Sequence, residues 1–161
     1  SKVSINGTLA ICFLSSSMPC LSVKIFSACA PGVDSSVSSS ACSSANLAFL
    51  DDDAWPKEDW LNKALKHFSD EKVAAVGGPA VTPDNDSDSQ KAAGLIFALG
   101  AGSMTYRYVP GKKVMEVDDF PSVNFLIRKN VFDKVGGFKS EFWPGEDTKL
   151  CYLVVYKEKA F

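Results

Sequence analysis

The stretch from Leu47 to Pro56 constrains the fold of this chain most, because an apolar run leads directly into three carboxylates. Leu47 to Leu50 form the apolar run, Asp51 to Asp53 follow it, and a helical pattern begins after Pro56. A short apolar run bounded by a breaker is typical of a buried strand. In open α/β sheets, ligands bind at the carboxyl ends of the strands. The sequence therefore predicts an acidic site where this strand ends.

Asp51, Asp52 and Asp53 allow two interpretations. Carboxylates a few ångströms apart disfavour joint ionisation unless something compensates them, and a hard divalent cation such as Mg²⁺ or Mn²⁺ would do so with help from substrate phosphates. Alternatively, Asp53 caps a helix that begins near Pro56, because Asp is a favoured N-cap and Pro a favoured first-turn residue. The triplet alone leaves both interpretations open, and a second acidic site downstream favours the first.

The bulk composition is that of one soluble globular domain, with 161 residues, 46% of them hydrophobic and 22% charged. The net charge of −2 gives no electrostatic case for nucleic acid as a partner. The five cysteines form no CxxC pair, so we expect no zinc site, and their odd number favours reduced thiols in the cytoplasm. The apolar run Ile11 to Leu14 is too short for a signal peptide or a membrane span. We therefore expect a cytoplasmic protein, and association with the inner face of a membrane through another part or a partner stays open.

Residues 1–46 match the pattern of an α/β domain only weakly, and their serine-rich segment is the least readable part of the chain. Leu9 to Leu14 and Leu21 to Phe26 are two apolar runs that are strand candidates. The serine-rich tract Ser35 to Ser44 is either a flexible linker or a poor helix of small residues packed on the sheet. The helix is slightly favoured, because the chain must deliver a strand to residue 47.

The segment after Pro56 has a clear helical period. Its apolar side chains share one face, and they are Trp60, Leu61, Ala64, Leu65 and Phe68. Val73 to Val76 then predicts a short buried strand, ended by Gly77-Gly78-Pro79. The two glycines permit either close backbone approach or positive φ.

The rest of the chain alternates between helical and extended patterns. Lys91 to Met104 predicts a packed helix, Val114 to Val117 a strand, and Val123 to Ile127 a second β-like run. Asn130 to Val135 predicts a short helix closed by the glycines at 136 and 137.

This half of the chain contains two pairs of adjacent acidic residues. Asp118-Asp119 is an acidic turn, and Glu146-Asp147 opens a helix that contains Leu150 to Val155. Acids in the first turn of a helix are stabilised by its dipole, so capping accounts for Glu146-Asp147 as well as a functional site does.

In this order the motifs closely resemble a family 2 glycosyltransferase of GT-A fold. The matching segments between Leu47 and Leu150 read AFLDDDAWPKEDWL, VAAVGGP, SVNFLIRKNVFDKVGGF and FWPGEDTKL. The DxD motif alone is weak. Together with Gly-Gly-Pro, Asn124 in its strand, Gly-Gly-Phe and Gly-Glu-Asp, in this order and at these spacings, it is a strong signal. The resemblance implies an α/β fold with a mixed, Rossmann-like central sheet flanked by helices. It also implies one glycosyltransferase domain over residues 1–161, incomplete at its C-terminus.

The resemblance also implies a role for each acidic residue. In the DxD match, Asp53 would ligate Mn²⁺ or Mg²⁺ at the donor diphosphate, and Asp51 would hold the ribose or the metal's water shell, with Asp52 assisting. Asp147 matches the catalytic base of inverting members, and Glu146 would orient it or the acceptor. The implied partners are a nucleoside-diphosphate sugar and a saccharide or lipid-linked acceptor.

Three further positions, Asn124, Trp143 and Gly145, match the sugar and acceptor pocket of the family. The chemistry suits these residue types independently of the resemblance. A metal held by carboxylates neutralises a leaving diphosphate, and a carboxylate base within hydrogen-bond reach of the acceptor typically contributes about 10²–10⁴-fold in rate.

The chain departs from the family pattern at both ends. Residues 1–46 carry no clear nucleotide-base loop, and serines stand where an Arg-Asn pair is usual. The chain ends at Phe161, where the family continues to a strand and a metal-binding histidine.

Three other classes compete with this interpretation. A haloacid dehalogenase phosphatase would need Thr or Val shortly after its second Asp, which Ala54-Trp55-Pro56 does not supply. A sugar nucleotidyltransferase would need a glycine-rich, basic N-terminal loop. An inactive domain that binds a nucleotide-sugar or a partner is favoured by the altered N-terminal third and opposed by Asp51, Asp53 and Asp147.

Overall fold

The computed structural model describes residues 2–6 and 11–13 as backbone, and residues 45–51, 54–99, 105–111 and 113–157 with their side chains. The predicted strand Leu21 to Phe26 and the serine-rich tract Ser35 to Ser44 lie outside the described residues. The described residues form a mixed α/β structure, which confirms the expected class at that level.

The main sheet has five strands in the order β3-β8-β5-β1-β7. Their bounds are β1 Lys2–Asn6, β3 Asn46–Leu50, β5 Val73–Gly77, β7 Val114–Val117 and β8 Asn124–Arg128. β1 and β5 are parallel, β8 runs antiparallel to β3 and β5, and β7 runs antiparallel to β1. The strands β1, β3 and β5 therefore end where β7 and β8 begin, and we call this side of the sheet the carboxyl edge.

Four of the five strands were predicted from their apolar runs, and the structure confirms them. The exception is β1, which the apolar pattern did not reveal. A parallel neighbour and an antiparallel neighbour enclose β1 in the sheet, and these are tertiary contacts that a five-residue pattern does not encode.

A second, three-stranded sheet has the order β4-β2-β6, with bounds β2 Ile11–Phe13, β4 Ala54–Pro56 and β6 Ala80–Val81. The predicted helix start near Pro56 is wrong, because Pro56 lies in β4 and pairs with Ile11 of β2. Helix α1 instead begins at Trp60, with Asp59 at its N-cap position. Asp53 is therefore not the cap of this helix.

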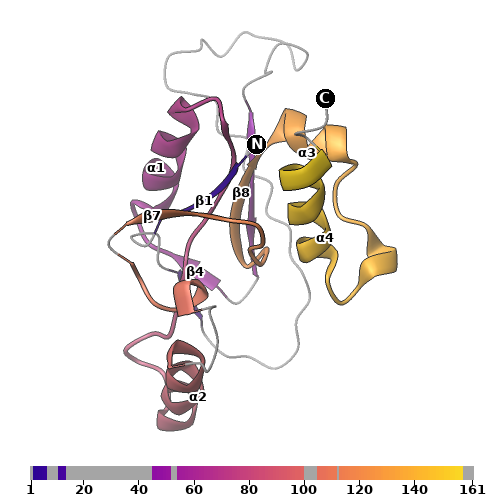
Figure 1. Cartoon of the computed structure of the whole chain (residues 1–161). Helices are drawn as coiled ribbons and strands as arrows, with labels where there is room; N and C mark the ends of the chain where they lie inside the picture. The colour runs from indigo at the N-terminus through magenta and orange to yellow at the C-terminus, as the bar shows by residue number, and fades with distance from the viewer. Residues whose placement is uncertain are drawn as a thin grey trace, which may run out of the picture.

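The helices cover both faces of the main sheet. Figure 1 shows α1 (Trp60–Leu65) on one side of the strands and α3 (Lys129–Val135) with α4 (Glu146–Tyr152) on the other. The 3₁₀ turn η1 (Lys66–Ser69) extends α1, and the π-helical turn η4 (Leu153–Lys157) extends α4. Gly136 ends α3 with φ 83°, as expected for a helix C-terminus.

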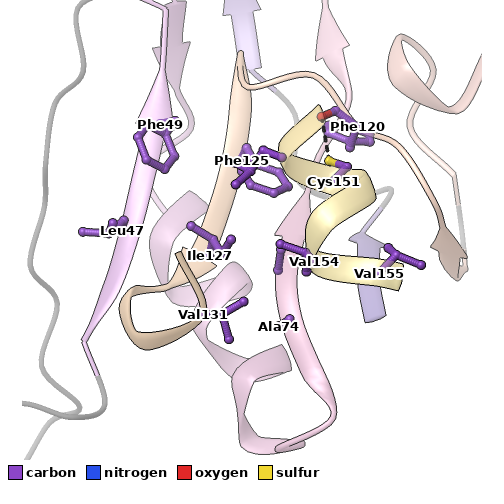
Figure 2. Close-up of a cluster of buried hydrophobic side chains, with 12 residues drawn as sticks. Leu47, Phe49, Ala74, Phe120, Phe125, Ile127, Val131, Cys151, Val154 and Val155 are labelled. Carbon is purple, nitrogen blue, oxygen red and sulfur yellow. Dashed lines mark hydrogen bonds between the residues drawn. The ribbon is translucent and has the colours of Figure 1, made fainter. Parts of the chain in front are cut away.

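The core consists of two clusters, one on each face of the sheet. Leu47 and Phe49 of β3 point to the α4 side, and Ala48 and Leu50 point to the α1 side, as strand alternation requires. Figure 2 shows the cluster on the α4 side, where side chains of β3 and β8 meet those of α4 and η4.

Helix α2 (Asp88–Ala98) differs from the others, because none of its residues is buried. Figure 1 shows it away from the sheet. Helix α2 confirms the helix predicted at Lys91 to Met104, but the predicted packing is wrong. The predicted start is also wrong, since Ser87 and Gln90 form a capping box that begins the helix earlier. Residues 100–104 of this prediction lie outside the described residues. No helix in the described ranges combines the length and hydropathy needed for a membrane span.

Candidate functional site at the carboxyl edge

Asp51 lies at the carboxyl edge, directly after the last residue of β3, and is half-buried. Its backbone carbonyl accepts a hydrogen bond from the amide of Ala54 at 3.1 Å, which turns the chain toward β4. Asp52 and Asp53 lie between these two residues and outside the described residues. Of the acidic triplet, the structure thus places Asp51 alone, at the edge where the sequence predicts the site.

Asn124 begins β8 and pairs with Leu50 across the sheet, next to Asp51. Its side chain is fully buried, and its Oδ1 accepts a hydrogen bond from the indole Nε1 of Trp60 at 2.8 Å. Its backbone carbonyl accepts a hydrogen bond from the amide of Gly78 at 3.1 Å. Asn124 therefore ties β8 to α1 and to the Gly-Gly-Pro turn, and its predicted role in the sugar pocket stays a prediction.

The sequence analysis missed the polar role of Trp60. The helical period places Trp60 on the apolar face of α1, and the structure confirms that it is buried. A buried indole N–H usually finds a hydrogen-bond partner, so the predicted burial of Trp60 was a signal that it forms such a bond. The partner lies 64 residues further along the chain, so only the fold identifies it.

Gly77 ends β5 at the same edge and is a glycine because of close packing. A Cβ atom there would lie 2.4 Å from Cδ1 of the Phe120 ring. Of the two explanations offered for this glycine, close backbone approach is therefore the correct one. The contact also brings the acidic turn Asp118-Asp119, which precedes Phe120, to the carboxyl edge.

An ion pair that the sequence analysis did not predict holds this turn. Nη2 of Arg107 lies 2.6 Å from Oδ2 of Asp119, and both side chains are half-buried. Arg107 Nε is also buried and has no hydrogen-bond partner among the described residues. The hydroxyl of Tyr156 donates to Oδ2 of Asp118 at 3.0 Å. Both carboxylates of the turn are therefore engaged with side chains far along the chain.

Glu146 and Asp147 form the first turn of α4 and are half-buried. Oε2 of Glu146 accepts from the amide of Gly145 at 3.0 Å, and Oδ1 of Asp147 accepts from the amide of Thr148 at 2.7 Å. Gly145 has φ 134°, a conformation that L side chains rarely adopt. These contacts are those of a helix start, and each carboxylate keeps a second oxygen for other partners.

Trp143 belongs to the loop that leads into α4. Its side chain is 76% exposed, and its amide donates to the carbonyl of Ser140 at 3.1 Å. A large exposed indole has a free apolar face, which is the feature that a sugar-stacking residue needs. Its predicted place in the acceptor pocket stays a prediction.

Cys151 connects α4 to the carboxyl edge. Its Sγ donates to the carbonyl of Phe120 at 3.4 Å, as the dashed line in Figure 2 shows. Burial raises the pKa of this thiol to about 12, and the negative charges of Asp119 and Asp147 add to the shift. Because Cys151 lies one turn after Asp147 and its Sγ contacts the residue that follows Asp119, the start of α4 lies near the acidic turn.

A divalent metal fits the chemistry of the acidic triplet. The predicted donor atoms are carboxylate oxygens, and Asp51 presents such oxygens at the end of β3, where Mg²⁺ and Mn²⁺ find suitable ligands. Among the described residues, no three His, Cys, Asp or Glu side chains converge. Two of the three predicted carboxylates, Asp52 and Asp53, lie outside that part of the chain.

Comparison with known proteins gives a consistent result. The family model described as Glycosyl transferase family 2 matches residues 39–136. The pre-mycofactocin glycosyltransferases of Mycobacterium tuberculosis strains CDC 1551 / Oshkosh and ATCC 25618 / H37Rv are each 31% identical to this chain over 116 residues. The match covers 71% of this chain and 24% of each relative, so the chain spans about a quarter of the length of these curated relatives. No solved structure matches the chain.

Proposed function

The chain belongs to glycosyltransferase family 2, and we propose that it forms part of an inverting, metal-dependent glycosyltransferase of GT-A fold. The reaction moves a sugar from a nucleoside-diphosphate donor to a hydroxyl of a saccharide or lipid-linked acceptor. The name of the relatives supports a glycosyl transfer. A cytoplasmic location, at the inner face of a membrane when the acceptor is lipid-linked, belongs to the same proposal.

The proposal rests on the position of Asp51 at the carboxyl edge, beside Asn124 and the Gly78 amide. Ligand crevices of open α/β sheets lie at such an edge. Asp51 and Asp53 would hold the divalent cation there, with Asp52 assisting. A bound cation supplies Lewis-acid neutralisation of the diphosphate charge, which is worth several kcal/mol.

Asp147 is proposed as the base, with its half-buried carboxylate at the start of α4. The acceptor oxygen forms a bond to the anomeric carbon while the bond from that carbon to the diphosphate oxygen breaks. The electron pair leaves with the diphosphate, and the acceptor proton passes to Asp147. Because attack and departure occur on opposite faces, the anomeric configuration inverts.

Three residues position the reactants in this proposal. Glu146 is bonded to the Gly145 amide, so it is held beside Asp147 to orient the base or the acceptor. Trp143 offers its exposed indole to the face of a sugar ring. Asn124 acts from below the edge, because its hydrogen bond to Trp60 fixes the strand next to Asp51.

Calorimetric titration tests the donor site. UDP, GDP and dTDP are titrated with and without Mn²⁺ into the unchanged chain, Asp51→Asn and Asp53→Asn. We expect manganese-dependent binding of one nucleotide that both variants weaken. The matched control is Glu71→Gln, an exposed acid next to the opposite end of β5, which should bind as the unchanged chain does.

Two results would contradict the proposal. If nucleotide binding is the same with and without metal and is unchanged in both Asp variants, the donor site does not lie at the carboxyl edge. Manganese-dependent binding without turnover of any donor, also in a longer protein that contains this chain, would favour the inactive binding domain instead.

A further inference from the structure

Four lysines line a hollow of about 490 Å³ between α3 and α4. Lys134 lies on α3, Lys139 in the loop that follows, Lys149 on α4, and Lys157 at the end of η4. Among the described residues that line the hollow, the one acid is Glu141. The whole chain has a net charge of −2, so this hollow concentrates positive charge against the overall balance.

Contacts with the protein hold two of these ammonium groups in place. Nζ of Lys149 lies 4.6 Å from the ring centroid of Phe142 and 5.4 Å from that of Tyr152. Nζ of Lys139 packs over Gly136, where a Cβ atom would lie 2.8 Å from it. Both lysines are half-buried. Their orientation toward the hollow is therefore set by packing, which reduces the entropy lost when a ligand binds.

Three of the lysines in this hollow lack an ion-pair partner inside the described part of the chain. Lys139, Lys149 and Lys157 form no ion pair there, whereas Lys129 of α3 pairs with Asp133. Helix dipoles favour a cation near the end of each helix. That effect accounts for Lys134, Lys149 and Lys157, which lie in the last turns of their helices. It does not account for Lys139, which lies in the loop after α3, and it does not explain why side chains from separate segments line one hollow.

We propose that this hollow binds a phosphate-type anion, that is, a phosphomonoester or diphosphate group. Lysine ammonium groups suit phosphate as compact point charges with several donors. The volume lies in the range of small-molecule sites, and Phe142, Val135 and Leu153 give it apolar walls for whatever carries the phosphate. None of its lining residues belongs to the proposed donor, metal or base set, so this is a second site.

Titration with inorganic pyrophosphate, without divalent metal and with a chelator present, tests the proposal. We expect saturable binding that weakens as salt screens the charges. Replacing both Lys139 and Lys149 by alanine should weaken it by about fivefold per lysine. Glu141→Gln should strengthen binding, because it removes the one opposing charge.

Two matched controls isolate the hollow. Lys129→Ala removes the same charge from α3 outside the hollow, and Asp51→Asn changes the carboxyl edge, so both should bind pyrophosphate as the unchanged chain does. Circular dichroism establishes that each variant is folded. The proposal is overturned if pyrophosphate does not bind, or if the double variant weakens binding no more than Lys129→Ala does.

A second probe identifies the source of the phosphate. The chain is sedimented with vesicles of phosphatidylcholine, with and without phosphatidic acid. If pyrophosphate also binds, vesicle binding that requires phosphatidic acid, Lys139 and Lys149 supports the site with a lipid headgroup as its ligand. Binding of pyrophosphate alone supports the site with a free phosphate compound. Vesicle binding that persists in the double variant, with no pyrophosphate binding, contradicts the proposal.

Discussion

The two faces of the main sheet are held by different kinds of contact. On the α1 face, directional hydrogen bonds add to an apolar cluster. Trp60 donates to Asn124, and the Arg128 guanidinium donates to the carbonyls of Val73 at 2.8 Å and Phe68 at 2.7 Å. On the α4 face, aromatic rings interlock. The Phe49 ring centroid lies 5.4 Å from that of Phe132 and 5.0 Å from that of Phe138.

This difference assigns separate tasks to the two faces. Hydrogen bonds fix α1 in one orientation beneath Asp51, because they depend on angle as well as distance. The α4 face carries the proposed base, and its geometry depends on how well apolar volumes fill the space. Changes of volume on the α4 face should therefore disturb both stability and the base, while polar changes on the α1 face should act mainly on stability.

The largest expected effect comes from the proposed base itself. Asp147→Asn should lower kcat by about 10²–10⁴-fold, because the amide cannot accept the acceptor's proton. The unfolding free energy should hardly change, since the amide oxygen can still accept from Thr148. Release of nucleoside diphosphate measures turnover in a preparation that shows transfer. Asp133→Asn on α3 is the control, and equal losses in both variants would exclude Asp147 as the base.

Phe120→Ala should have the largest effect on stability. The ring is 1% exposed and packs against Gly77, so its removal leaves a cavity on the α4 face. A loss of about 3–5 kcal/mol in unfolding free energy is expected for such a truncation. Urea titration measures it. A loss below about 1 kcal/mol would mean that this side of the core is filled more loosely than the structure shows.

Trp60→Phe tests the hydrogen bond between Trp60 and Asn124 on the α1 face. The phenyl ring keeps most of the buried apolar surface but removes the donor to Asn124, so we expect a loss of about 1–3 kcal/mol in unfolding free energy. Trp55→Phe is the matched control, because Trp55 is 61% exposed in β4 and should change stability by less than about 0.5 kcal/mol. Equal effects in the two variants would show that the Trp60 bond adds nothing.

Near neutral pH, the pH response of Cys151 should be the smallest effect. Burial holds the pKa of the folded thiol at about 12, above its usual value of about 8.5. The folded state keeps its proton more tightly than the unfolded state. The resulting share of stability is therefore complete below pH of about 8.5 and is lost as pH rises through about 12. At pH of about 8, iodoacetamide should label Cys151 slowly in the folded chain and rapidly in urea, as peptide mapping would show.

Much of the fold follows from local patterns in the chain. The strands at 46–50, 73–77 and 124–128 are apolar runs whose side chains are buried on both faces. The short helix at 129–135 ends at a glycine with positive φ, as the Gly-Gly pair predicts. These features depend on neighbours within a few residues, so the sequence carries them directly. The order of the acidic motifs also identifies the family, which the comparisons confirm.

Tertiary structure decides the features that depend on distant partners. Pro56 is in a strand and not in a helix because β2 pairs with it across the smaller sheet. Asn124 is buried because α1 supplies the indole of Trp60, and Asp119 is held by Arg107 from a separate turn. The lysines at 139, 149 and 157 line one hollow because α3 and α4 pack on the same face of the sheet. Local propensity specifies the helices and strands. Long-range packing decides which polar groups become partners, because packing determines which distant groups are buried together and must then satisfy each other's hydrogen bonds.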